Sequence, residues 1–158
     1  MTECLDHTKL ATVIRNSIDD SVCRESVGDL VVELVKLRDV LRFLQNEETH
    51  DFQLLNSITA VDYIEFFQLV YHLTSLRHNH SVVIKADIFD RFDPIAPSVI
   101  DIWRGADYQE REVYDLMGIK FKNHPNLKRL LLWEGFEGHP LRRDYLEPPM
   151  PYNWPQGG

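Results

Sequence analysis

Hydrophobic residues follow a helical spacing in two short stretches near the start of the chain. Apolar side chains in residues 7–17 recur on one side of a helix, and those between Leu37 and Leu44 do the same. We therefore expect two amphipathic helices. The run at 30–35, which lies between them, is rich in leucine and valine and favours a strand.

Residues rich in β-branched and aromatic side chains fill the middle of the chain, and apolar residues alternate at Val82, Ile84, Ala86 and Ile88. Residues 52–61 and 65–76 predict two long strands joined by a tight turn near Asp62 and Tyr63, and residues 81–89 predict a third strand. These three strands would form an antiparallel meander. Because the strands come in a block after the helices, the predicted class is α+β, with a mostly antiparallel sheet of three to four strands and helices packed on one face.

A further helix is predicted at residues 108–117. Asp107 can serve as its N-cap, with Glu110 three residues later in a variant of the capping box, and Gly118 stands where a glycine would close the helix. Just before it, residues 97–101 favour a short helical turn.

Glycine and proline become frequent after this helix, which predicts short strands and ordered loops up to residue 146. Residues 147–158 contain four of the eight prolines, so an extended proline-rich tail is expected there. We therefore predict a single α+β domain at residues 1–146, followed by that tail.

The composition of the 158 residues, 44% hydrophobic and 27% charged, allows one domain with a sizeable core. The apolar runs are far shorter than the roughly 18 residues that a bilayer crossing needs. The first residues lack a basic start followed by an apolar segment, so no secretory signal is expected. Any membrane association would then come through another chain.

Charge is distributed unevenly along the sequence. The net charge of -8 argues against a general nucleic-acid binder. Residues 1–90 contain 15 acidic residues against 8 Lys or Arg, whereas residues 120–143 contain six Lys or Arg against two Glu. The basic segment is either a solvated face or a docking surface for an acidic partner.

The sequence gives little support for a catalytic or metal site. Cys4 and Cys23 form no CxxC pair, and two cysteines cannot supply the four thiolates that an iron–sulfur cluster usually takes. The His78-Asn79-His80 run favours the tip of a β-hairpin over a metal chelate. Common protease, hydrolase and nucleotide-binding motifs do not occur. We therefore expect no catalytic, cofactor-binding or metal-binding residue on this chain.

Charged residues on the predicted 108–117 helix have two interpretations. Arg111 and Asp115 are four residues apart and would form a surface ion pair worth about 0.3 to 0.5 kcal/mol. Alternatively, they would join a partly buried network with Arg142, Arg143 or Asp144, in which the loss of one partner would cost about 3 kcal/mol.

Two histidines stand beside prolines, in His124-Pro125 and in Gly138-His139-Pro140. Each imidazole is expected to hydrogen-bond a loop rather than to titrate in catalysis. The following Arg142-Arg143-Asp144-Tyr145 run combines two guanidinium groups with an aromatic ring, which are side chains enriched at protein interfaces.

Residues 103–145 together resemble the signature of the thirty-kilodalton subunit of proton-pumping NADH:quinone oxidoreductase, which is respiratory complex I. A Glu-Arg-Glu-x-x-Asp run at 110–115, the His124-Pro125 pair and Gly-His-Pro-Leu-Arg-Arg-Asp-Tyr at 138–145 carry the resemblance, with looser matches from residue 57. Asn123 stands where many members have glycine. The resemblance favours the buried network over the surface pair. It implies an interface and structural motif made of Glu110, Arg111, Asp115, His124, His139, Arg142, Arg143, Asp144 and Tyr145.

For function, the resemblance implies a peripheral-arm subunit without a redox centre, which packs against the quinone-site subunit and the iron–sulfur subunits. FMN, the iron–sulfur clusters, NADH and quinone would bind to other subunits, and no nucleic acid would bind. The chain would reach an energy-transducing membrane only through the complex, on the cytoplasmic, matrix or stromal side, with a bacterial inner membrane as the expected location.

Three alternatives remain open. The chain could serve a related complex with another electron donor, such as a ferredoxin-driven photosynthetic complex or a membrane-bound hydrogenase. It could also be a stand-alone metal hydrolase built on its histidines, or an RNA binder that uses its basic segment. The hydrolase and RNA hypotheses do not account for the contiguous motif.

Overall fold

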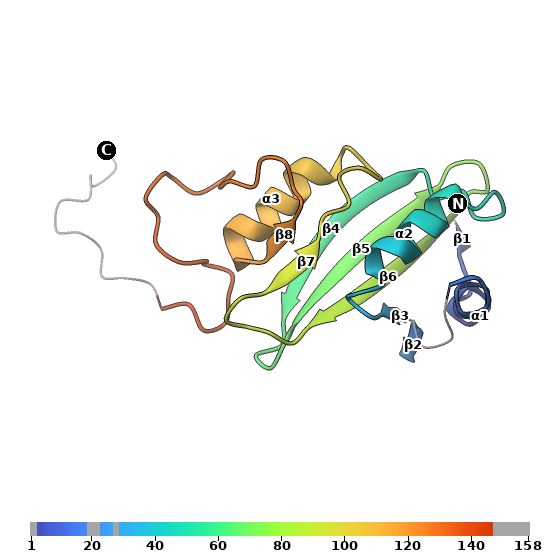
Figure 1. Ribbon diagram of the computed structural model, residues 1–158, viewed down its shortest axis with the longest axis horizontal. Helices are drawn as coiled ribbons and strands as arrows, with labels where there is room; N and C mark the ends of the chain where they lie inside the picture. The colour runs from blue at the N-terminus through green and yellow to red at the C-terminus, as the bar shows by residue number, and fades with distance from the viewer. Residues whose placement is uncertain (1–2, 19–22, 27–28, 147–158) are drawn as a thin grey trace.

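Three long strands form the centre of the molecule (Figure 1). The computed structural model describes residues 3–18, 23–26 and 29–146. Strands β4, β5 and β6 pair antiparallel with their sequence neighbours, so the predicted meander is confirmed. Their bounds are Leu54–Asp62, Phe67–Ser75 and His80–Ile88.

Shorter strands widen the sheet to six. β3 (Asp29–Val32) pairs parallel with β6, β2 (Cys23–Ser26) pairs antiparallel with β3, and β1 (Glu3–Cys4) pairs parallel with the start of β6. The α+β class is confirmed and most of the pairing is antiparallel, but the sheet exceeds the three or four strands expected. Strands of two or four residues are too short for alternation to mark them. The predicted strand at 30–35 stops early because residues 33–37 form a turn.

Both predicted N-terminal helices are present, as α1 (His7–Ser17) and α2 (Leu37–Asn46). Asp6 caps α1, since its carboxylate accepts the Thr8 N–H at 3.0 Å. Helix α2 lies across one face of the sheet (Figure 1). The buried side chains of both helices join those of the strands in one contiguous hydrophobic core.

Successive residues of β5 point to opposite faces of the sheet. Phe67, Leu69, Tyr71 and Leu73 face the core and are at most 1% exposed. On the other face, His72 is exposed. This alternation assigns the helices to the side of the odd-numbered residues.

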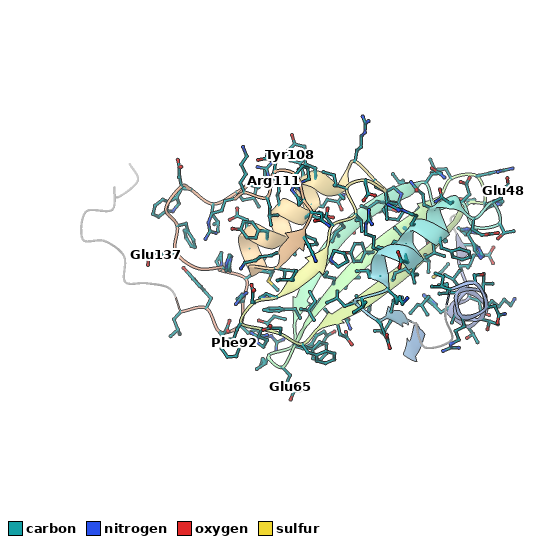
Figure 2. The ribbon with its side chains drawn as sticks, in the orientation of Figure 1. Glu48, Glu65, Phe92, Tyr108, Arg111 and Glu137 are labelled. Atoms are coloured by element: carbon teal, nitrogen blue, oxygen red, sulfur yellow. The ribbon has the colours of Figure 1, made fainter. Side chains whose placement is uncertain are left out.

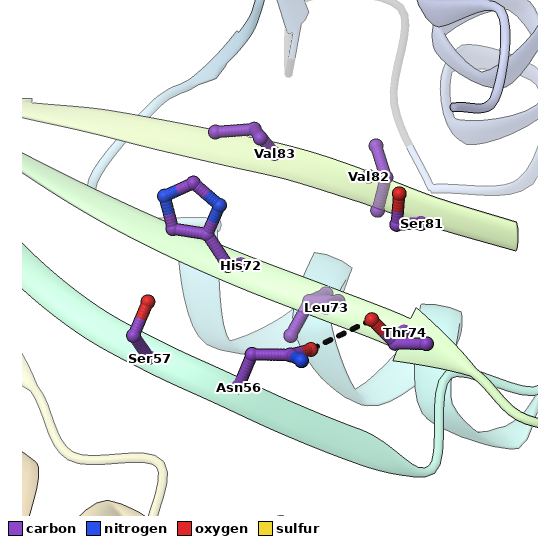
Figure 3. Close-up of a pocket in the computed structure, with 8 residues that line it drawn as sticks. All are labelled: Asn56, Ser57, His72, Leu73, Thr74, Ser81, Val82 and Val83. Atoms are coloured by element: carbon purple, nitrogen blue, oxygen red, sulfur yellow. Dashed lines mark hydrogen bonds between the residues drawn. The ribbon is translucent and has the colours of Figure 1, made fainter. Parts of the chain in front are cut away.

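Figure 3 shows the second face of the sheet, with α2 behind the strands. His72 and Thr74 lie beside Asn56 and Ser57 of the neighbouring strand, and the Thr74 hydroxyl donates to Asn56 Oδ1 at 2.7 Å. The shallow depression here contains none of the motif residues between 110 and 145.

The turn between β5 and β6 confirms the hairpin interpretation of the histidine run. Asn79 has a φ of +53°, a conformation that asparagine tolerates well. His78 Nε2 lies 2.8 Å from Glu48 O, and His80 Nε2 lies 2.9 Å from His50 O. The two imidazoles therefore hold the neighbouring loop to the hairpin.

Helix α3 (Ala106–Met117) runs along β4, the edge strand of the sheet. The Ile58 N–H of that edge donates to Gln109 Oε1 at 2.6 Å, so the helix satisfies a group that would otherwise lack a partner in the sheet. Gly118 ends the helix with a φ of +73°, as predicted.

The predicted capping box of α3 is wrong. The helix begins at Ala106 with Gly105 as its N-cap, which places Asp107 inside the first turn. Glu110 does not reach back along the helix, because its carboxylate is bound by residues 98 and 99. Capping motifs name residue types that also suit long-range contacts, and here the tertiary contact prevailed.

A parallel pair of short strands, β7 (Ile95–Pro97) and β8 (Lys120–Lys122), flanks α3. The predicted helical turn begins at Val99, because Pro97 belongs to β7. Residues 123–146, here called the C-terminal segment, form the loops that extend beyond α3 in Figure 1. The predicted tail at 147–158 lies outside the described residues.

Candidate functional site

The buried carboxylate of Asp115 organises the C-terminal segment. Its Oδ2 accepts the N–H groups of Leu130, Leu131 and Leu132 at 2.9, 2.7 and 2.9 Å, and its Oδ1 accepts from Arg129 at 2.8 Å. Burial alone would raise the pKa of Asp115, but the donors outweigh it and lower this pKa to about 2. One charged side chain of α3 thus fixes four consecutive residues of the segment.

Arg111 also binds the C-terminal segment, one turn earlier on α3. Its guanidinium donates to the carbonyl oxygens of Lys128 and Arg129 at 3.2 and 3.3 Å. The predicted ion pair between Arg111 and Asp115 is therefore wrong. Asp115 directs both oxygens to residues 129–132, and Arg111 turns to backbone carbonyls, so the two residues bind the same loop rather than each other.

The predicted network partners of Asp115 are also wrong. We expected Arg142, Arg143 or Asp144, whereas the structure places Arg129 there. Arg129 additionally donates to Gly138 O at 3.0 Å, which links the two halves of the segment. Sequence reasoning missed Arg129 because it lies in an irregular loop, where spacing says nothing about contacts.

Glu110 ties α3 to the loop that precedes it. Its side chain is fully buried and accepts the Ser98 hydroxyl and the Val99 N–H, each at 2.7 Å. Burial raises the pKa of Glu110 to about 7, against the opposing effect of these two hydrogen bonds. Ser98 was not recognised from the sequence.

Both proline-flanked histidines contact backbone carbonyls of helix α3, whereas the sequence predicted hydrogen bonds to a loop. His124 Nδ1 accepts the Asn126 N–H at 3.0 Å, which leaves Nε2 to donate to Asp107 O at 3.3 Å. His139 Nδ1 lies 2.9 Å from Asp115 O. Asn123 has a φ of +68°, a region open to asparagine as well as to glycine.

Close packing explains two glycines of the motif. A Cβ on Gly118 would lie 2.5 Å from His139 Cδ2, and one on Gly138 would lie 2.7 Å from the Tyr145 ring. Both residues also have a positive φ. The Tyr145 ring lies 6.2 Å from that of Phe136 and closes this part of the segment.

A second charged cluster holds the end of the C-terminal segment to the sheet. Asp62, at the end of β4, is 5% exposed and pairs with Arg91 at 2.5 Å. Arg91 also reaches Asp144 at 3.2 Å, and the Arg143 N–H donates to Asp62 at 3.0 Å. Burial would raise the pKa of Asp62, but Arg91 and the backbone donors lower it to about 2.

Arg142 and Arg143 have opposite environments. Arg142 donates to Met117 O at 2.6 Å, and its guanidinium lies 5.0 Å from the centre of the Phe67 ring. Arg143 is exposed, and among the described residues its guanidinium makes no hydrogen bond or ion pair. Arg142 is therefore internal, whereas Arg143 is available to a partner.

The C-terminal segment exposes large apolar side chains although its backbone is firmly held. Leu131, Trp133, Leu141 and Leu146 are 61%, 58%, 59% and 88% exposed. Large apolar side chains exposed on a firmly held loop are typical of a protein interface. The geometry therefore indicates binding to a protein partner.

Comparison with known proteins shows which family has this sequence. The family model of the "Respiratory-chain NADH dehydrogenase, 30 Kd subunit" matches residues 30–150. The chain is 36% identical over 147 residues to a subunit of the NADH-quinone oxidoreductase of Roseiflexus castenholzii, covering 89% of this chain and 84% of that relative. It is 39% identical over 142 residues to the like-named subunit of Citrifermentans bemidjiense, covering 87% and 85%. The chain belongs to this 30 kDa subunit family.

A solved structure extends the comparison beyond bacterial NADH-quinone oxidoreductases. This 30 kDa family member aligns with a chain of the membrane-bound sulfane sulfur reductase, an archaeal respiratory membrane complex, with a TM-score of 0.72 and 26% identity. The alignment covers 87% of this chain and 84% of the other. Among the described residues, no helix is both long enough and apolar enough to cross a membrane.

Proposed function

We propose that this chain is a peripheral-arm subunit, without a redox centre, of a proton-pumping NADH:quinone oxidoreductase. It binds the quinone-site subunit and neighbouring iron–sulfur subunits and holds them together while electrons pass from NADH to quinone. FMN, the iron–sulfur clusters, NADH and quinone bind to those other subunits. The family membership and the relatives named as NADH-quinone oxidoreductase subunits support this proposal.

The main support for a docking role is that the C-terminal segment has a firmly held backbone and outward-facing side chains. Asp115 and Arg111 hold its backbone from within, while Trp133, Leu131 and Arg143 point away from the core. Fixing the loop in advance reduces the conformational entropy that is lost when a partner binds. A firmly held apolar surface of this kind suits a permanent protein partner, and the exposed Arg143 suits an acidic group on that partner.

The chain then reaches the membrane only through the complex, on the cytoplasmic side of a bacterial inner membrane or on the equivalent side in an organelle. The net charge of -8 supports attachment through protein partners, because it opposes direct binding to anionic lipid.

A second candidate function is the equivalent role in a complex with another electron donor. The likeness to the archaeal membrane-bound sulfane sulfur reductase favours it, because that respiratory complex is not named for NADH. The site described above would serve either complex, since it contacts partners and not the donor.

Affinity purification tests both candidates. The tagged chain is recovered from membranes solubilised in mild detergent, and the co-purifying chains are identified by mass. We expect NADH-oxidising and iron–sulfur subunits together with NADH:quinone reductase activity. A ferredoxin-linked or hydrogenase module in their place would select the second candidate, and recovery of the chain alone would exclude both.

A further inference from the structure

Aromatic and aliphatic side chains gather at the end of the sheet where β4 turns into β5 and β6 ends. This surface, here called the aromatic end, consists of Tyr63, Ile64, Phe66, Phe89 and Phe92. Ile64, Phe89 and Phe92 are 61%, 68% and 102% exposed. The Phe66 ring lies 5.0 Å from that of Tyr63 and 5.5 Å from that of Phe89, so three of the rings are contiguous. Large apolar surfaces of this kind on a soluble fold mark binding sites.

The turn between β4 and β5 holds the Ile64 side chain in an exposed position. Ile64 has a φ of +72°, which is sterically unfavourable for a β-branched residue. Two hydrogen bonds fix this turn: Ile64 N–H to Asp62 Oδ1 at 2.7 Å, and Tyr63 N–H to Phe66 O at 3.0 Å. Strained backbone that is held this firmly is found at functional positions.

The rim of the aromatic end is acidic. Figure 2 shows Phe92 and Glu65 on the same side of the molecule, at the lower edge of the view. Asp90 is exposed, and its carboxylate accepts the N–H groups of Phe92 and Asp93 at 3.0 and 3.1 Å. The nearby Arg91 is already paired with two carboxylates. These charges match a basic partner and disfavour the anionic surface of a membrane.

The aromatic end is continuous with the C-terminal segment. Asp62 begins the strained turn, accepts the Arg143 N–H and pairs with Arg91, which in turn binds Asp144. Arg91 also lies 4.4 Å from the centre of the Phe67 ring, directly beneath the turn. A partner that covers the C-terminal segment at Arg143 therefore lies next to the aromatic end.

We propose that the aromatic end is a second docking surface, occupied by another protein of the same complex that presents an apolar pocket with a basic rim. The inference rests on the proposed function, because that function supplies the complex. Phe92 is the central anchor, since its ring is fully exposed and free to enter a pocket.

Site-specific photocrosslinking in the intact complex tests the proposal. Phe92 is replaced by p-benzoylphenylalanine in the tagged chain, membranes are irradiated, and the products are identified by mass. We expect a covalent product with another subunit of the complex. The matched control replaces Leu76, which is 72% exposed at the opposite end of β5, and should give at least tenfold less of that product.

A second measurement separates docking from folding. The Phe89→Ser, Phe92→Ser double variant should lose at least tenfold of the co-purified partner subunits while the isolated chain keeps its thermal midpoint, and Leu76→Ser should change neither. A crosslink only to lipid or to a second copy of the chain, or no crosslink in a complex that is still recovered, would overturn this inference alone. Recovery of the chain without any partner would overturn the proposed function and this inference with it.

Discussion

Asp115 shows how a single carboxylate can set the shape of a long loop. Three successive N–H groups and one guanidinium converge on its two oxygens. Such donors are costly to bury without an acceptor, so the loop and the carboxylate depend on each other. The same residue also uses its backbone carbonyl to hold His139.

Replacement of this carboxylate should be strongly destabilising. Asp115→Asn keeps the shape but directs an amide NH₂ group at N–H donors and leaves Arg129 without its charge partner, so we expect the free energy of unfolding to fall by about 3 kcal/mol. Urea denaturation of the isolated chain measures it. The control Glu112→Gln, on an exposed position of the same helix, should change stability by less than about 0.5 kcal/mol.

A double-mutant cycle identifies the partner. Asp115 and Arg129 should couple by more than about 1 kcal/mol, whereas Asp115 and Arg143 should show coupling near zero. The reverse result would mean that Arg143 and not Arg129 closes the network.

At the scale of elements, two carboxyl groups connect α3 and β4 to neighbouring loops, and the protonation state of each affects stability. Glu110 connects the helix to the loop at residues 98 and 99, while Asp62 and Arg91 connect β4 to the C-terminal segment. The pKa of Glu110 is raised and that of Asp62 is lowered. Acidification therefore reduces the stability contributed by Asp62, whereas a rise in pH reduces that contributed by Glu110.

Glu110 should make the protein less stable as the pH rises. A carboxyl group with a raised pKa in the folded state is protonated there while the unfolded chain ionises, so stability falls between the unfolded value of 4.5 and about 7. Relative to Glu110→Gln, the wild type should therefore lose about 3 kcal/mol between pH 4.5 and pH 8. Urea denaturation of both proteins across this range measures the difference, and parallel pH profiles would contradict the buried, protonated state.

At the scale of the whole molecule, the chain combines a compact core with two groups of exposed apolar residues. The core lies between the sheet and its helices, whereas eight of the fourteen exposed large apolar residues among those described lie on the C-terminal segment and at the aromatic end. The family relatives are subunits of NADH-quinone oxidoreductases, and we propose that these surfaces contact partner subunits.

Substitutions of the two neighbouring arginines should distinguish an effect on assembly from an effect on stability. Arg143→Ala should leave the isolated chain within about 0.5 kcal/mol of the wild type, because an exposed charge contributes little, yet weaken its incorporation into the complex. Arg142→Ala should destabilise the isolated chain by about 1 to 3 kcal/mol, since Met117 O loses its donor. Denaturation and quantitative co-purification measure the two effects, and normal assembly of the Arg142→Ala, Arg143→Ala double variant would contradict a docking role for either residue.

Local sequence patterns predicted a large part of this molecule. The helices at His7–Ser17 and Leu37–Asn46, the three-stranded meander and the glycine that ends α3 all follow from spacing over a few residues. Such patterns are informative because one buried face imposes a period on neighbouring residues. The motif at 110–145 likewise pointed to the family before any contact was known.

Only the tertiary structure decided which residues meet. The parallel pairing of β3 with β6, the binding of Asp115 by Arg129, and the joining of Asp62, Arg91 and Asp144 all connect parts of the chain that are distant in sequence. An irregular loop has no period, so its partners depend on how the whole chain packs rather than on spacing. For the same reason the two neighbouring arginines cannot be told apart in the sequence, and only folding placed the half-buried Arg142 against Phe67 and left Arg143 exposed.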